Sequence, residues 1–251
     1  MSESPFFIGY APMPKAWRAL YALLMVGFVG FFGAIGFLIG AGQDAPEPAG
    51  FRFDYGRQTV TGVIEMSPYP ILHVTEGTDR IPAGRSLIMS GQGKTGIDAQ
   101  LAPMMGRLAV VSGVALERGT IDMLQVRGGR QGVSEAEGTA PDIPVEPLGR
   151  WRLAGEICDG KCLSGAMRPG RGLAHKACAS LCLLGEVPPV FVSSQPVDGT
   201  DFLLITGPDE TPLPQAAYDM IGRYIYVEGD LERRGDMLVL RMDPDTMELI
   251  E

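Results

Sequence analysis

The sequence predicts a mainly β protein, with one N-terminal transmembrane helix followed by two tandem five-stranded barrels. Three observations predict this fold class: an uncharged apolar segment near the N-terminus, an internal repeat in the rest of the chain, and four cysteines confined to one stretch of the second copy. At 251 residues, with 34 Gly and 20 Pro, the chain can hold one large domain or two small ones built from short strands and turns.

The apolar segment lacks Asp, Glu, Lys and Arg over 24 positions, from Ala19 to Gly42. This is long enough for a helix to cross a hydrocarbon core of about 30 Å. A cleavable signal peptide is the alternative, but its apolar region usually has only about 7 to 15 residues. We therefore expect a retained transmembrane helix at residues 19–42.

The charges beside this segment predict its orientation. Lys15 and Arg18 precede it, whereas Asp44 and Glu47 follow it. Positive charge favours the cytoplasmic side. We therefore expect a single-pass protein of the inner (cytoplasmic) membrane, with residues 1–18 in the cytoplasm and the C-terminal domains in the periplasm.

One face of the expected helix carries mostly small residues, at positions 22, 25, 29, 33, 36 and 40. Such a face allows close approach by another transmembrane helix, although glycine is also common in membrane spans generally. We expect an integral membrane protein complex as partner. A nucleic-acid partner is not expected, because residues 51–251 contribute −8 to a net charge of −9 and phosphate binding needs clustered Lys and Arg.

The rest of the chain repeats itself at an offset of 116 positions. Residues 87–91 (LIMSG) recur as 203–207 (LLITG), and residues 104–107 (MMGR) recur as 220–223 (MIGR). Each copy reads as three strands, a short helix and two strands, which is the order of an OB-type barrel. We expect a first OB-like domain at residues 51–127, a linker at 128–149 and a second OB-like domain at 150–251, with short helices at 97–104 and 214–220.

The second copy contains an insertion. Its first strand, at residues 153–157, matches residues 60–64 at an offset of only 93, so the second copy is 23 residues longer before its third strand. The excess falls within the cysteine segment, residues 158–187. The loop between the first two strands of OB barrels is a frequent ligand contact. We therefore expect a plain barrel near the membrane and a distal barrel with a specialised loop.

Four side chains of this segment form a candidate metal site. A short helix is expected at Leu173–Leu184, between glycines, and places three potential ligands within about 60° of one another. With one cysteine before the helix, the set is Cys162, His175, Cys178 and Cys182, and Cys158 is a possible substitute. Three cysteines and one histidine suit zinc, although ligand softness also leaves copper or iron open.

Two other uses of the cysteines stay open. In an oxidising periplasm, Cys158 and Cys162 can form a disulfide, or Cys162 can link to the helix. A Cys178–Cys182 bridge is less favourable, because one helical turn holds Cβ atoms about 5 to 6 Å apart and a disulfide needs about 3.8 Å. A catalytic thiol at Cys178 is the third reading, since Lys176 and the helix N-terminus would supply positive potential.

Other motifs carry less weight. Residues 91–95 (GQGKT) look like the end of a phosphate-binding loop, but Ile88 stands where that motif requires its first glycine. We interpret His73 as a strand residue. No serine triad or pair of catalytic carboxylates can be proposed from the sequence, so we do not expect catalytic residues.

The loop itself resembles a motif of poorly characterised bacterial membrane-anchored proteins. The resemblance covers about 30 residues, from Lys161 (KCLSGAMRPG) through the helix to the two prolines at 188–189. It implies a shared loop centred on Cys162, His175, Cys178 and Cys182 more than on Cys158, and it brings no established activity. Residues 185–187 are Gly-Glu-Val here, where the resemblance implies Gly-Gly-Ile, so the shape of that turn is open.

Together these features predict a periplasm-facing accessory subunit of a membrane complex, respiratory or electron-transferring. The Cys/His loop would bind a metal or be linked by disulfides, and would contact the partner together with the Gly-rich helix face. The alternative is a periplasmic thiol-redox or metal-handling assembly factor, which would exchange its metal or cycle a cysteine pair.

Overall fold

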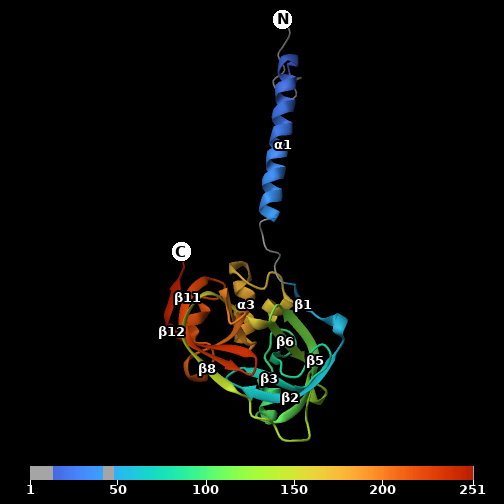
Figure 1. Cartoon of the computed structure of the whole chain (residues 1–251), viewed down its shortest axis with the longest axis vertical. Helices are drawn as coiled ribbons and strands as arrows, with labels where there is room; N and C mark the ends of the chain where they lie inside the picture. Colours follow the sequence, from blue (N-terminus) through green and yellow to red (C-terminus); the bar gives the residue numbers. More distant parts are fainter. Residues whose placement is uncertain (1–13, 42–47, 251) are drawn as a thin grey trace. The chain divides into compact units, whose positions relative to one another are not determined.

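The computed structural model describes residues 14–41 and 48–250, in two units, residues 1–46 and 47–251. In the first unit, a 3-10 turn at Lys15–Trp17 leads into helix α1, Arg18–Ala41 (Figure 1). The stretch Lys15–Ala41 contains an 18-residue window with a mean hydropathy of 2.4 and is long and apolar enough to span a membrane. Gly42, the last residue of the predicted span, and residues 1–13 of the predicted cytoplasmic segment lie outside the described residues.

The first barrel is closed by hydrogen bonds along the path β5-β2-β3-β4-β6, with β6 pairing back onto β5. Strands β4 and β6 run parallel, and a short helix lies between β4 and β5. This is the OB strand order. The elements are β1 (Ala49–Phe51), β2 (Gln58–Met66), β3 (Pro70–Glu76), β4 (Ser86–Ser90), α2 (Asp98–Leu101, continued by a 3-10 turn at Ala102–Met104), β5 (Leu108–Arg118), β6 (Ile121–Val126) and β7 (Val133–Glu135).

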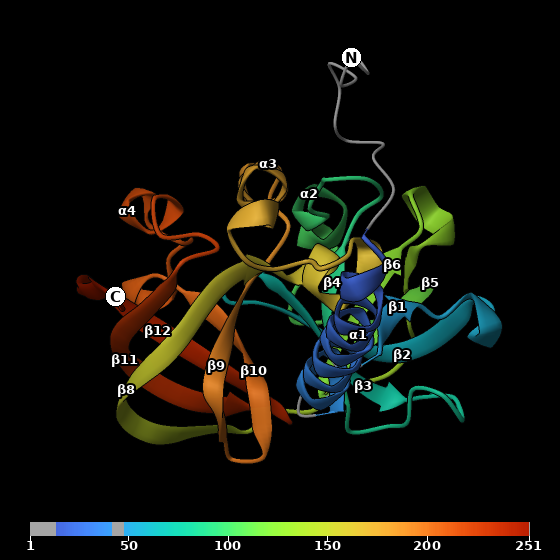
Figure 2. The same cartoon turned by 90° about the horizontal axis from the view of Figure 1, so that it is seen from above.

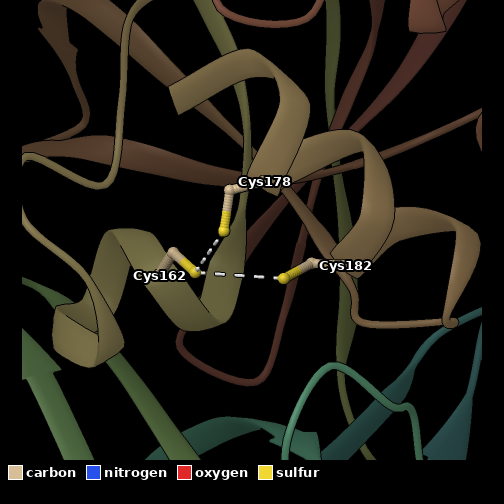
Figure 3. Close-up of side chains that lie close together, drawn as sticks. All are labelled: Cys162, Cys178 and Cys182. Atoms are coloured by element: carbon tan, nitrogen blue, oxygen red, sulfur yellow. Dashed lines mark hydrogen bonds between the residues drawn. The ribbon is translucent and has the colours of Figure 1, made fainter. Parts of the chain in front are cut away.

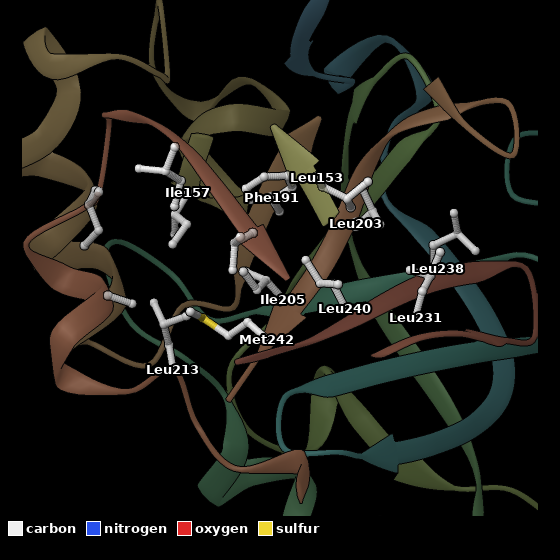
Figure 4. Packing of buried hydrophobic residues seen from close by; sticks show 14 of the residues in the cluster. Leu153, Ile157, Phe191, Leu203, Ile205, Leu213, Leu231, Leu238, Leu240 and Met242 are labelled. Atoms are coloured by element: carbon white, nitrogen blue, oxygen red, sulfur yellow. The ribbon is translucent and has the colours of Figure 1, made fainter. Parts of the chain in front are cut away.

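The second barrel has the same topology, closed along β10-β12-β11-β8-β9 with β10 parallel to β12. Apolar side chains from all five strands fill its interior (Figure 4). The elements are β8 (Val145–Asp159), α3 (Lys176–Leu184), β9 (Pro189–Val197), β10 (Thr200–Thr206), α4 (Gln215–Tyr218), β11 (Tyr224–Arg234) and β12 (Met237–Leu249). The predicted fold class, two OB-like barrels after one apolar helix, is confirmed.

A pair of glycines shows the physical basis of the repeat. A Cβ on Gly113 in β5 would lie 2.4 Å from the carbonyl oxygen of Gln125, and a Cβ on Gly229 in β11 would lie 2.4 Å from that of Arg241. The two glycines are 116 positions apart, and each lies against the fifth strand of its barrel. The repeated glycine therefore reflects the same close backbone approach in both barrels.

The two barrels pack against each other through an apolar interface (Figure 2). Five consecutive residues are buried in β3, β4 and β9, because one face of each strand lines its barrel and the other meets the neighbouring barrel. The buried side chains at this interface include Ile71, Ile88, Met123, Val190, Val192 and Leu204. Residues 48–250 thus belong to one compact unit, in which the two barrels are packed together.

The expected linker at 128–149 is only partly a linker. Residues Val133–Glu135 form β7, which pairs with β5, and β8 already begins at Val145. Similarly, β1 begins at Ala49, two residues before the predicted start of the first domain, and also pairs with β5. The Gly and Pro content of residues 128–149 predicts a linker, but part of this segment forms strands that pair with the barrels.

A charged cluster crosses the same interface. Arg234 at the end of β11 has a side chain that is only 7% exposed, and it forms ion pairs with Glu65 of the first barrel and with Glu210 and Glu232 of the second. The Nε2 atom of His73 lies 2.7 Å from the Glu65 carboxylate. His73 is a residue of β3, as predicted, and its role here is to complete this cluster.

Candidate metal centre

The cysteine segment lies between β8 and β9, and helix α3 fixes it to the second barrel. Ala179 and Leu183, one turn apart, are buried in the core of that barrel. Cys178 and Cys182 occupy the adjacent row of the helix. The row contacts Cys162, which lies in the irregular helical turn Cys162–Ala166 after β8. The predicted helix at residues 173–184 is confirmed as a 3-10 turn, Leu173–His175, followed by α3.

Three sulfur atoms meet at this point (Figure 3). The Sγ atom of Cys162 lies 4.0 Å from that of Cys178 and 3.9 Å from that of Cys182, and all three lie within 4.8 Å of one another. Sulfur ligands about 2.3 Å from a tetrahedral zinc ion would be about 3.8 Å apart. The sulfur triangle therefore has the dimensions of one face of a tetrahedral thiolate site.

His175 lies beside this triangle with a different partner. Its Nε2 atom is 3.1 Å from Oδ2 of Asp159, and the Oδ1 atom of Asp159 accepts the backbone N–H of Cys162 at 2.8 Å. Asp159, Cys162 and His175 form a second group of potential ligands within 4.8 Å. Cys162 thus belongs to both groups, whereas His175 is not grouped with Cys178 and Cys182.

Cys158 lies outside both groups. Its side chain is buried in the apolar interface between the barrels, and its Sγ atom donates to the Glu156 carboxylate at 3.1 Å. Burial, reinforced by the charge of Glu156, raises the pKa of the Cys158 thiol well above its ordinary value. The strand alternation in β8 explains the separation, because Cys158 points to the interface face of the barrel.

Two lysines that the sequence analysis did not assign complete the surroundings. The Nζ atom of Lys94, from the first barrel, lies 2.7 Å from the Sγ of Cys178 and 3.9 Å from that of Cys182. The hydrogen bond to Cys178 raises the pKa of Lys94. Lys161 is buried, and burial lowers its pKa, although the cysteines and Asp159 partly offset this effect.

Lys94 belongs to the GQGKT segment that only resembled a phosphate-binding loop. The Nζ atom of Lys161 donates to the carbonyl oxygens of Gly91 and Gly93 at 2.6 and 2.8 Å, and Gly96 N–H donates to Gly185 O. These bonds fasten the β4–α2 loop of the first barrel to the cysteine segment of the second. The candidate centre therefore lies where the two barrels meet.

The thiols of Cys162 and Cys182 affect each other's pKa through a hydrogen bond. A hydrogen bond from Cys162 lowers the pKa of Cys182, whereas the same bond and burial raise the pKa of Cys162. All four cysteines are free thiols in the structure. Since thiolates bind metals, binding at this centre must release the proton of Cys162, and the affinity should rise with pH.

The turn after α3 contains a left-handed residue, Glu186. Glu186 has a φ of 68°, in the left-handed region where glycine is preferred and other residues lose about 1 to 2 kcal/mol. The resemblance implies glycine at this position. Glu186 therefore adopts this turn at some cost in stability.

Replacing Gly185 with alanine should destabilise the docking of the two loops. A Cβ at this position would lie 2.0 Å from the carbonyl oxygen of Lys94, so the backbone that carries Lys94 must shift. We expect a loss of about 1 to 3 kcal/mol in unfolding free energy, measured by denaturant titration. Gly128→Ala is the control, since its Cβ meets nothing within 4 Å; equal effects of the two changes would contradict the close contact.

Comparisons with known protein families, with curated proteins and with solved structures give no match for this chain.

Proposed function

We propose that this chain is a membrane-anchored metal protein, in which Cys162, Cys178 and Cys182 hold a transition-metal ion, with zinc as the preferred metal. We further propose that the protein serves as an accessory subunit of an integral membrane complex. The observation that carries the proposal is the sulfur triangle with edges of 3.9 and 4.0 Å at Cys162. His175 and Asp159 border it as a buried hydrogen-bonded pair that shares Cys162 with the triangle.

The subunit role draws on the apolar helix and on the charges flanking it. The span would place the barrels in the periplasm, and the respiratory or electron-transfer context of the complex stays a prediction from topology. The resemblance to bacterial membrane-anchored proteins likewise stays a prediction. The face of α1 with Gly33, Gly36 and Gly40 would contact the partner.

The test is purification of the full chain from membranes in a mild detergent. We expect a stoichiometric integral membrane partner and about one zinc ion per chain. Gly36→Leu should reduce the amount of partner recovered, whereas Gly27→Leu, on the opposite face of the helix, should not. Recovery of the chain alone contradicts the subunit role, and recovery without metal contradicts the metal centre.

One observation favours a metal-handling or thiol-redox factor as a second candidate. Cys178 is only half-buried and Lys94 is exposed, so one side of the sulfur triangle is accessible. An accessible site suits exchange of the ion or oxidation of a cysteine pair. Release of zinc to a chelator separates the two: a subunit should retain its ion for hours, and a handling factor should lose it within minutes.

A further inference from the structure

The arrangement of the candidate centre leaves one position without a protein ligand. Three thiolates occupy three corners of a tetrahedron, and a fourth ligand is needed to close it. The imidazole of His175 is buried and directs its Nε2 atom to Asp159 at 3.1 Å. Asp159 is itself held by the amide of Cys162. This pair is satisfied within the fold and need not supply the fourth donor.

Access to the fourth position is one-sided. Cys162 and Cys182 are buried, whereas Cys178 is half-buried and the Lys94 ammonium beside it faces solvent. Lys94 comes from the first barrel, 84 positions away from Cys178. A ligand entering the centre would therefore pass Lys94 and reach the ion next to Cys178.

Charge selects the class of ligand. A divalent ion with three thiolates carries a net charge of −1. Two lysines border it: the Nζ atom of Lys94 lies 2.7 Å from the Sγ of Cys178, and Lys161, next to Cys162 in the chain, donates to carbonyl oxygens of the loop that carries Lys94. Asp159 and His175 are both buried beside Cys162, so the charged group that an entering ligand meets is the exposed Lys94 ammonium, which favours an anion. Among monoanions, a thiolate matches the softness of an all-sulfur donor set.

We propose that the centre reserves its fourth coordination position for a thiolate supplied from outside the chain, and that Lys94 attracts and orients this ligand. The proposal rests on the metal centre proposed above. It makes Lys94 a positioning residue contributed by the first barrel, and it gives the contact between the β4–α2 loop and the cysteine segment a role in ligand selection.

The experiment uses the full chain in detergent, with its ion replaced by cobalt(II) and with 2-mercaptoethanol as the probe thiol. Sulfur-to-cobalt charge-transfer absorption should rise saturably, because a fourth sulfur joins three. Lys94→Gln should weaken the apparent affinity for the thiol roughly fivefold. Lys176→Gln is the matched control, since it removes the same charge from a lysine that contacts the Asp219 carbonyl instead of sulfur.

Three outcomes overturn the proposal in distinguishable ways. If the chain takes up no cobalt, the metal centre itself is refuted and this inference falls with it. If cobalt binds but its spectrum responds to the thiol only after His175→Asn, the imidazole is the fourth ligand. If Lys94→Gln and Lys176→Gln behave alike, Lys94 has no part in ligand binding.

Discussion

Replacing Cys162 with serine should lower the affinity of the protein for zinc by at least about a hundredfold. Its Sγ atom is the shared corner of the site, 4.0 Å from that of Cys178 and 3.9 Å from that of Cys182, and it also belongs to the group with Asp159 and His175. Loss of residues that merely orient metal ligands already costs 10- to 100-fold in affinity, so loss of the central ligand should cost more. Competition with a chromogenic chelator measures the change.

Cys158→Ser is the matched control, because Cys158 is a buried cysteine near the end of β8 that contacts Glu156 instead of the other sulfurs. A serine hydroxyl can make the same hydrogen bond, so zinc stoichiometry should stay unchanged. Equal loss of zinc in both variants would indicate a folding effect, and unchanged affinity in Cys162→Ser would exclude the sulfur triangle as the metal site.

Replacing Arg234 with methionine should lower the unfolding free energy of the soluble region by roughly 3 kcal/mol. The side chain is nearly buried and pairs with Glu65, Glu210 and Glu232, so its loss leaves carboxylates uncompensated in the interface between the barrels. The estimate is at the low end for buried pairs because Glu210 is 41% exposed. Denaturant titration of the full chain in detergent measures the change.

This effect should depend on pH. Burial opposes the charged form of Glu65, but hydrogen bonds from His73 and Arg234 outweigh it and hold the pKa of Glu65 below its ordinary value of 4.5. A carboxyl group with a lowered pKa stabilises the fold above its ordinary value, and the stabilisation is lost as pH falls through the folded-state pKa. The difference between the wild type and Arg234→Met should thus be complete at pH 7 and shrink below pH 4.5.

Arg233→Met is the control for the second prediction. Arg233 is adjacent, but it is 30% exposed and pairs with the exposed carboxylates of Asp198 and Glu146. Exposed pairs of this kind contribute about 0 to 1 kcal/mol. A loss at Arg234 no larger than that at Arg233 would mean that the charged cluster does not hold the barrels together.

The barrels could be predicted because the repeat records a shared topology. The offset of 116 aligns β4 with β10 and Gly113 with Gly229. Each of these glycines permits the same close approach of a carbonyl oxygen from the neighbouring strand. The packing of one barrel on the other was not foreseen. Its signal was present in β3, β4 and β9, where apolar residues continue instead of alternating, as strands buried on both faces do.

The candidate site could be predicted only in part from the sequence, because local patterns place residues of one helix but not residues of separate segments. Helical periodicity places Cys178 and Cys182 on one face, because they are one turn apart. The approach of Cys162 depends on a loop whose path local patterns do not determine. Lys94 is 84 positions from Cys178, and no local sequence pattern links the two segments. His175 lies on the expected helix, but its Nε2 atom pairs with Asp159, and it is grouped with Cys162 rather than with Cys178 and Cys182.

The central claim is that three thiolates of this chain hold a metal ion, and X-ray absorption at the zinc edge tests it most directly. On full-length protein purified from membranes without added thiol or chelator, we predict three sulfur neighbours at about 2.3 Å and one lighter neighbour at about 2.0 Å. Zinc surrounded only by nitrogen and oxygen, or protein without metal whose Cys162 is joined to Cys178 or Cys182 in a disulfide, would contradict the account.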